Sequence, residues 1–267
     1  MYWGFYFTVL PDRRGVGAGD LEYALAEVAS DPRWTEDLRL LHDAGERVGK
    51  SHANSLIASR PLKKVLAARI VVFELFLKLA KDLDGELEER HKRAWLFFQL
   101  SNPQANPSDS HPFVHIMKSC LHQASTHALN KLIDRFGALR QKHMPRTHFI
   151  AGVDEAQVAV RLSRHSFVSS SSDQVYRTIL HEIAKTFSIE PIKLVVSGTG
   201  ITLEDLRDSV ASGVSKPATV ILHHNLGMFD TWSKLQSFLE RYIPSSFLET
   251  IPGGVLKQRI REYLLGR

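Results

Sequence analysis

Three short apolar segments, each ending in polar residues, restrict the folds open to this chain of 267 residues. They are FIAGVDEAQ from Phe149, PIKLVVSGTG from Pro191 and PATVILHHN from Pro217. A fourth segment, WGFYFTVL from Trp3, is rich in the aromatic and β-branched residues that strands favour. Buried strands of this length, separated by helical segments, are typical of a parallel sheet covered on both faces. We therefore predict an α/β fold with a mostly parallel sheet in a three-layer α/β/α arrangement.

The residues between the first two strands carry the apolar period of helices. We predict an acidic helix near Leu21–Ala29 and a helical insertion over about residues 60–142. In the insertion, Pro61 opens a helical stretch that breaks at Gly85, where a glycine can end a helix, and resumes to about Leu100.

Two further helices are predicted from apolar spacing and from helix start signals. Pro112 opens a helix whose apolar face runs without interruption to Phe136 and places Cys120 in the core. Another helix is expected to begin near Asp173, because Ser171 and Gln174 have the spacing of a capping box.

The bulk composition gives only broad limits. Lysine and arginine number 34 against 29 acidic residues, a net charge of +5, which favours an anionic partner, but the basic residues are spread along the chain. One cysteine allows no internal disulfide. The N-terminal segment lacks the basic leader of a signal peptide, and Arg69, Glu74 and Lys78 interrupt the most apolar run. We predict a soluble intracellular protein of the cytoplasm or nucleus, without a transmembrane helix or a membrane partner.

The acidic pair at the end of the second strand carries the strongest chemical signal. Asp154 and Glu155 directly follow the apolar residues from Phe149 to Val153. Ligands of parallel sheets bind at the carboxyl ends of strands, and in P-loop ATPases a first carboxylate there holds Mg²⁺ while the next polarises the attacking water. We predict Asp154 as the Mg²⁺ ligand and Glu155 as a catalytic residue. The alternative is an acidic cap on an ordinary turn.

A second polar pair, Ser197 and Thr199, ends the next predicted strand. A hydroxyl at that position can bond the γ-phosphate or the attacking water, so both residues are predicted to be catalytic in a sensor role. Taken alone, this motif favours a plain glycine turn. Two such strand ends in this order, with a helix between them, are harder to obtain by chance.

Several segments together resemble the P-loop ATPase domain of Crinkler-type proteins of fungi and oomycetes. They are WGFYF, GVGAGDLE, FIAGVDEAQVA, VVSGTGITLED and the tail RYIPSSFLE…REYLLGR. The resemblance covers nearly the whole chain and implies an AAA/STAND-like P-loop NTPase that binds and hydrolyses ATP with Mg²⁺. We assign residues 1–230 to the P-loop NTPase-like core and residues 231–267 to the start of a C-terminal helical lid region.

The resemblance also implies that part of the family domain is missing. In the family, the strand and phosphate-binding (Walker A) loop lie upstream of WGFYF, and further helices follow LLGR. We therefore expect a truncated domain in which ATP hydrolysis is impaired. Whether the chain is an enzyme is left open; if it is active, it is an ATPase.

The stretch Ala44–Ser51 reads A-x-x-x-x-G-K-S, a relaxed form of the missing loop, with Gly49, Lys50 and Ser51 as its nucleotide-binding residues. A working loop needs a buried strand before it and a glycine turn whose amides face the phosphates. The preceding WTEDLRLLHD instead predicts an amphipathic helix, and Glu46 would place a carboxylate beside the phosphates. We interpret the match as a coincidence.

Two other hypotheses belong to different functional classes. The first is a non-catalytic interaction scaffold, in which an unpaired sheet edge binds a protein partner or a second copy of the chain. The second is nucleic-acid binding driven by the basic charge, although the sequence has no base-reading motif. The histidines between residues 111 and 127 lack a second ligand cluster, so we predict no zinc site.

Overall fold

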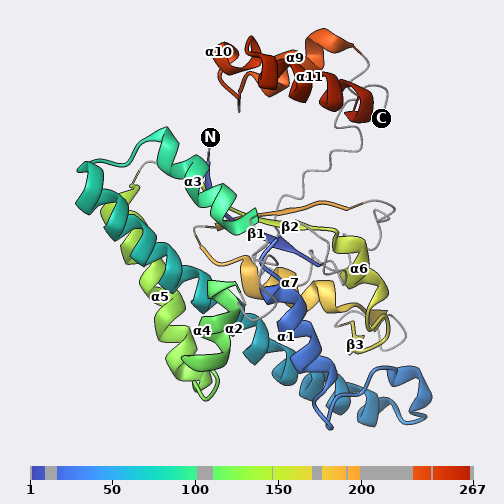
Figure 1. Ribbon diagram of the computed structural model, residues 1–267. Coiled ribbons are helices and arrows are strands. Elements are labelled where there is room, and N and C mark those ends of the chain that lie inside the picture. Colours follow the sequence, from blue (N-terminus) through green and yellow to red (C-terminus); the bar gives the residue numbers. More distant parts are fainter. Residues whose placement is uncertain are drawn as a thin grey trace. The chain divides into compact units, whose positions relative to one another are not determined.

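The computed structural model divides the chain into two compact units, Met1–Val220 and Ile221–Arg267 (Figure 1). The division lies close to the predicted boundary after residue 230. The structure describes residues 2–9, 17–100, 111–145, 147–169, 176–190, 192–198, 231–241 and 243–264.

A parallel three-stranded sheet lies in the first unit. Its strands are β1 (Trp3–Thr8), β2 (Phe149–Asp154) and β5 (Ile192–Val196), in the order β1-β2-β5. These three strands were predicted and are confirmed; the strand predicted from Pro217 lies outside the described residues. The register pairs Thr8 with Asp154, so the carboxyl ends of the strands meet at one edge of the sheet. A short antiparallel pair joins β3 (Phe167–Val168) to β4 (Tyr176–Arg177).

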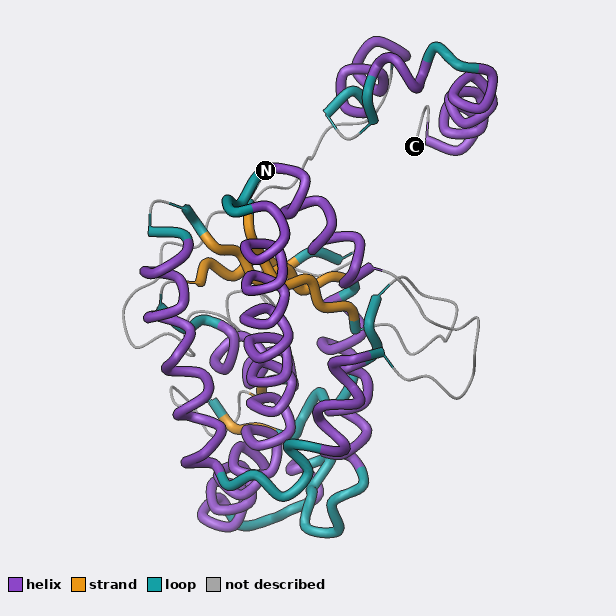
Figure 2. The backbone as a smooth tube through the Cα atoms, turned by 60° about the vertical axis from the view of Figure 1, so that its left-hand side comes forward, coloured by secondary structure: helices purple, strands orange, loops and turns teal. Residues whose placement is uncertain are grey.

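Helices make up most of the remaining described chain. In the first unit they are α1 (Asp20–Ala29), η1 (Leu38–Leu40), α2 (Ala44–Asp84), α3 (Glu89–Leu100), α4 (Pro112–Ser119), α5 (Thr126–His143), α6 (Ala156–Arg161) and α7 (Ile179–Phe187). Figure 2 shows α2 running through the middle of this unit, and α1, α4, α5 and α7 all contact it. None of the described helices is long and apolar enough to span a bilayer.

The second unit holds α9 (Trp232–Leu239), α10 (Ser245–Leu248) and α11 (Ile251–Leu264), as the helical spacing of the tail predicted. Its small core contains Leu235, Leu239 and Leu248. Gly253 allows a close approach in this unit, because a Cβ there would lie 1.9 Å from the carbonyl oxygen of Phe247.

Aromatic side chains fill the space between the sheet and the helices. Burial alternates along β1 and β2, so one face of the sheet lies in the core and the opposite face is half-buried. This differs from the expected sheet buried on both faces. On the buried face, the ring of Phe5 lies 5.8 Å from the rings of both Phe73 and Phe136 and 4.7 Å from that of Phe149, centroid to centroid. Edge-to-face packing of this kind adds to the free energy of burial.

Helix α2 begins 17 residues before the predicted start at Pro61. The side chain of Asp43 accepts a 2.7 Å hydrogen bond from the amide of Glu46 and caps the helix N-terminus. Pro61 lies buried within the helix, where it has no backbone donor and its ring crowds the carbonyl four residues before it, a local cost that the packing of the long helix outweighs. Gly85, with a φ of 77°, ends the helix as predicted.

Two other helix predictions are corrected. The helix predicted from Pro112 to Phe136 breaks between α4 and α5, because Ser125 caps a new helix with a bond to the amide of Ala128. Cys120 lies in this break and is exposed, so its predicted core position is wrong. The residues at which another helix was expected to begin, Ser171 to Gln174, lie outside the described residues; the next described helix, α7, begins at Ile179 after the short strand β4.

A fully buried ion pair joins α1 to α2. The Arg69 guanidinium donates to both carboxylate oxygens of Asp20, at 2.7 and 2.8 Å, and neither side chain is more than 2% exposed. The same guanidinium lies over the rings of Phe7 and Phe113, with its central carbon 4.6 and 4.1 Å from their centroids. Arg69 also donates a 2.7 Å bond to the side-chain oxygen of Gln99 on α3.

Gln99 carries this network to the edge of the sheet. Its side-chain oxygen accepts the amide of Tyr6 at 2.9 Å, and its side-chain nitrogen donates to the carbonyl of Gly4 at 3.1 Å. Trp95 donates to the same carbonyl at 2.8 Å. Backbone groups that a further strand would pair are therefore bonded by side chains of α3, so this edge is not free for strand addition.

We predict that Arg69→Met lowers the free energy of unfolding by about 3–5 kcal/mol, because it leaves the Asp20 carboxylate buried without its cation. Adding Asp20→Asn to this variant should recover part of the loss. Urea unfolding measures both. The matched control is Arg33→Met, which breaks a similar but exposed pair with Asp31 and should change little. An equally small effect of Arg69→Met would show that the buried pair is unimportant.

Candidate functional site

The Asp154 carboxylate is the centre of a hydrogen-bond cluster at the carboxyl ends of the three strands. The Tyr6 hydroxyl of β1 donates to one carboxylate oxygen at 2.7 Å. The other oxygen accepts the Ser197 hydroxyl at 2.7 Å and the backbone amide of Glu155 at 2.9 Å. The predicted residues Asp154, Glu155 and Ser197 are thus brought together, and Thr199 lies outside the described residues.

These hydrogen bonds set the ionisation of the cluster. Burial by itself would raise the pKa of Asp154, but the bonds from Tyr6, Ser197 and the Glu155 amide outweigh it, and the pKa lies below its ordinary value. Burial, the bond to Asp154 and the nearby carboxylates raise the pKa of Tyr6. Tyr6 therefore stays a proton donor and Asp154 stays an anion at neutral pH.

The backbone holds Glu155 and Ser197 beside each other. Glu155 has a φ of 55°, a left-handed backbone conformation that residues other than glycine seldom adopt, and it directly precedes the short helix α6. The amide of Ala156 donates to the Ser197 carbonyl at 3.0 Å, and the Ser197 amide donates to the Val153 carbonyl at 2.8 Å. The Gln157 side chain donates to the Glu155 carboxylate. The sharp turn after β2 therefore places Glu155 against the end of β5.

Sequence reasoning missed two residues next to Asp154: Tyr6, which bonds its carboxylate, and Thr8, which pairs with it across the strands. Both lie on the half-buried face of the sheet or at its end, in alternation with the buried Phe5 and Phe7. The Thr8 hydroxyl oxygen is buried and has no hydrogen-bond partner among the described residues, although Thr8 pairs with Asp154 across the strands. The sequence does show hydroxyl-bearing residues alternating with phenylalanine along β1. It does not show that these residues lie beside Asp154, because that depends on the register between β1 and β2.

The cluster suits a cation that takes few protein ligands. Across the described ranges there is no group of three or more histidine, cysteine, aspartate or glutamate side chains that could hold a metal ion. Mg²⁺ is usually bound through one or two carboxylates, with waters and substrate phosphates completing its shell. Asp154 still has a lone pair on the oxygen bonded by Tyr6, and the unpartnered Thr8 hydroxyl lies at the same edge. These donors fit Mg²⁺ and do not fit an all-protein metal cage.

The structure places Gly49, Lys50 and Ser51 inside α2, away from the strand ends. What precedes this helix is neither a strand nor the predicted amphipathic helix, but the short 3₁₀ turn η1. Lys50 is exposed, and the Ser51 hydroxyl accepts the backbone amide of Val168 at 2.9 Å, which holds β3 against the helix. The strand and glycine turn of a phosphate loop are therefore absent around these three residues.

No protein-family model, curated protein or solved structure matches this chain. The Crinkler-type family stays a prediction, and the chemistry of the site depends on its own residues.

We predict that Tyr6→Phe raises the pKa of Asp154, because it removes a donor to the carboxylate. A titration of the Asp154 carboxyl carbon by NMR measures this, with Tyr2→Phe as a control that leaves Asp154 untouched. A lowered native pKa stabilises the fold above the unfolded value near 3.9 and loses that effect as pH falls through the native value. The stability difference between wild type and Tyr6→Phe should therefore shrink below about pH 4. An unchanged Asp154 pKa would contradict the assigned bond.

We predict that Gly49→Ala stabilises the chain by about 0.5–1 kcal/mol, because alanine is favoured over glycine inside a helix. A Cβ at Gly49 would meet no atom within 4 Å. The opposite control is Gly4→Ala, where the new Cβ would lie 2.5 Å from the Ile150 carbonyl oxygen and should destabilise. Thermal unfolding compares the two. Destabilisation by Gly49→Ala would indicate a glycine-dependent turn at this position.

Proposed function

We propose that the strand-end cluster is a Mg²⁺-nucleotide site of the P-loop NTPase kind, in a Crinkler-type domain with a three-layer α/β/α fold. The supporting observation is the convergence of three strand ends on Asp154, with Tyr6 and Ser197 bonded to opposite oxygens of one anionic carboxylate. Parallel sheets bind ligands at this edge.

Each residue has a distinct role in the proposed site. Asp154 would hold Mg²⁺, which neutralises charge on the phosphates when it is bound. Glu155 would orient the attacking water, since it directly follows β2 and its backbone conformation is sharply turned. Ser197, whose hydroxyl is exposed, would bond the γ-phosphate or the water. Phosphoryl transfer depends mainly on such positioning and on charge stabilisation.

We expect nucleotide binding and ATP hydrolysis by this chain to be weak. Phosphates need a cradle of backbone amides, as a glycine turn before a helix provides. The described part of the chain holds no such turn at Gly49–Ser51, where the A-x-x-x-x-G-K-S match lies. The acidic cluster alone would attract Mg²⁺ without fixing the triphosphate.

A sheet-edge scaffold is the second candidate function. Side chains of α3 occupy the outer edge of β1, and β5 is the other outer strand of the sheet in the described residues, so we propose β5 as the edge that a partner would approach. Val195 on that strand is 50% exposed, which is unusual for a large apolar residue in a sheet. A concentration-dependent change in oligomeric state, reduced by Val195→Lys, would favour this candidate.

The proposed function predicts weak, Mg²⁺-dependent binding of a fluorescent ATP analogue. Asp154→Asn should weaken the Mg²⁺-dependent binding by about tenfold or more, because it removes the charged metal ligand. Lys50→Ala is the matched control and should bind like wild type, since Lys50 lies exposed on α2. Glu155→Gln should leave binding intact and lower the residual ATPase rate.

Three outcomes would contradict this proposal. Equal losses in Asp154→Asn and Lys50→Ala would move the phosphate site to α2. Binding that does not respond to Mg²⁺ or to Asp154→Asn would remove the metal role. Rapid turnover lost on Glu155→Gln would show that the phosphates are held well despite the missing turn, and our expectation of weak hydrolysis would be wrong.

A further inference from the structure

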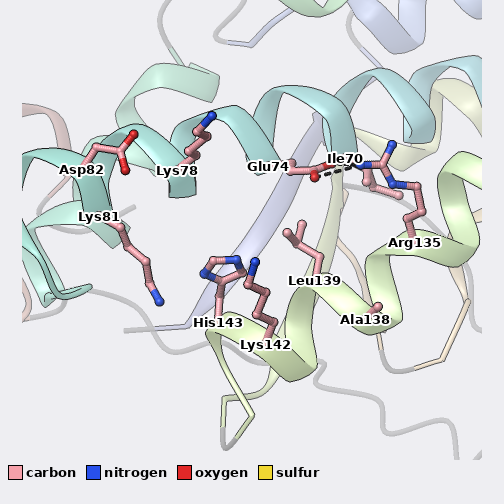
Figure 3. Close-up of a pocket in the computed structure, with 10 residues that line it drawn as sticks. All are labelled: Ile70, Glu74, Lys78, Lys81, Asp82, Arg135, Ala138, Leu139, Lys142 and His143. Atoms are coloured by element: carbon pink, nitrogen blue, oxygen red, sulfur yellow. Dashed lines mark hydrogen bonds and ion pairs between the residues drawn. The ribbon is translucent and has the colours of Figure 1, made fainter.

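A groove of about 540 Å³ lies between the C-terminal half of α2 and the last turns of α5 (Figure 3). It has an apolar wall, formed by Ile70, Ala138 and Leu139. It also has a basic end, formed by Lys81, Lys142 and His143. Figure 3 shows Lys81 of α2 and Lys142 of α5 both extending toward His143. A volume of this size is typical of sites for small organic ligands.

The charges at the two ends of the groove differ. At one end, Arg135 donates to both carboxylate oxygens of Glu74 at 2.8 Å, so these charges neutralise each other. At the basic end, the described residues form no ion pair with Lys81 or Lys142. Lys78 and Asp82 of α2 also line the groove, with one charge of each sign, and form no ion pair among the described residues. The basic end therefore has two lysines, one from each helix, without an ion-pair partner in the described ranges.

His143 reports this local charge. Its Nδ1 atom is buried and has no hydrogen-bond partner in the described part of the chain. Burial, Lys81 and Lys142 lower the pKa of His143, and the carboxylate of Glu74 opposes them. A neutral imidazole donates from one ring nitrogen only, so His143 can donate a hydrogen bond to an anion in the tautomer that carries its proton on the side of the groove.

We propose that the groove binds a small organic phosphate, with the phosphoryl group at the basic end and an apolar part of the ligand against the apolar wall. A phosphomonoester dianion matches the charges of the two lysines at that end. A carboxylate would match only one of them.

A nucleic-acid backbone fits the groove less well. Its phosphates are spaced along a strand and need a stripe of cations. Here the cation at the far end, Arg135, is paired with Glu74, and Lys81 and Lys142 lie together at the basic end. The Glu74 carboxylate lies in the path of a continuous backbone, although Arg135 compensates its charge. The apolar wall also has no counterpart in a phosphate backbone. These features favour a small ligand with one charged group.

The groove lies apart from the strand-end cluster. α5 ends at His143, and β2 then runs from Phe149 to Asp154. Six residues of strand span about 20 Å, so the groove is near the amino end of β2 and Asp154 is at the other. The proposal is independent of the nucleotide proposal, and either one can fail without the other.

Phenyl phosphate is the probe that tests the groove, in titrations of the full chain at 0.15 M salt. The ring signals of His143, identified by their loss in His143→Gln, should shift on addition of phenyl phosphate. Calorimetry should show that Lys81→Gln and Lys142→Gln each weaken binding by about tenfold or more, as expected for the loss of a charged hydrogen bond. Inorganic phosphate should bind more weakly, because it lacks an apolar part, and phenol should not bind.

The matched control is Lys78→Gln, which removes the same charge from the same groove. Its ammonium group points away from α5 in Figure 3, so binding should change by less than about threefold. An equal loss in Lys78→Gln would show general attraction and overturn the site. Equal affinities for phenyl phosphate and inorganic phosphate would overturn the role of the apolar wall. Displacement of the probe by a short RNA with a steep dependence on salt would identify a nucleic-acid surface instead.

Discussion

The buried pair between Arg69 and Asp20 is the interaction on which the first unit depends. A guanidinium and a carboxylate at most 2% exposed are tolerable only when each compensates the other, and here the third guanidinium nitrogen donates to Gln99. Gln99 in turn satisfies the edge of β1. One charged side chain in α2 thus links α1, α3 and the sheet. Its planar fork supports this geometry, which a lysine would not provide.

The position of β1 then determines the strand-end cluster. Tyr6 reaches Asp154 only because β1 is held in register with β2. The backbone amide of Tyr6 donates a hydrogen bond to the side-chain oxygen of Gln99, which helps to hold β1 in place. The buried network and the candidate site therefore share Tyr6. The network bonds the backbone amide of Tyr6, and the site uses its hydroxyl group. A carboxylate held by donors from β1, from β5 and from its own turn is pre-organised, and such groups lose little when a ligand arrives.

Strand ends were easier to predict than helix ends in this chain. Asp154 and Ser197 were found because polar residues directly follow the short apolar runs of β2 and β5. The start of α2 was misplaced because Pro61 is a strong start signal. The helix in fact begins at the cap formed by Asp43 and the amide of Glu46, and it continues through Pro61. The same local residues spell both a helix cap and a phosphate-loop match.

Interactions between distant residues could not be predicted from the sequence. Arg69 interrupts an apolar run, which signals a buried charge, but its partner Asp20 lies 49 residues away and only the fold selects it. Likewise, Lys81 and Lys142 become one basic end only because α2 and α5 pack against each other. The net charge of +5 could not predict where an anion would bind, because most of the lysine and arginine residues lie outside this groove. Lys81 and Lys142 lie at one end of the groove without an ion pair among the described residues, and burial together with both lysines lowers the pKa of the adjoining His143. This favours the groove over the scattered basic residues as the place where the chain binds negative charge.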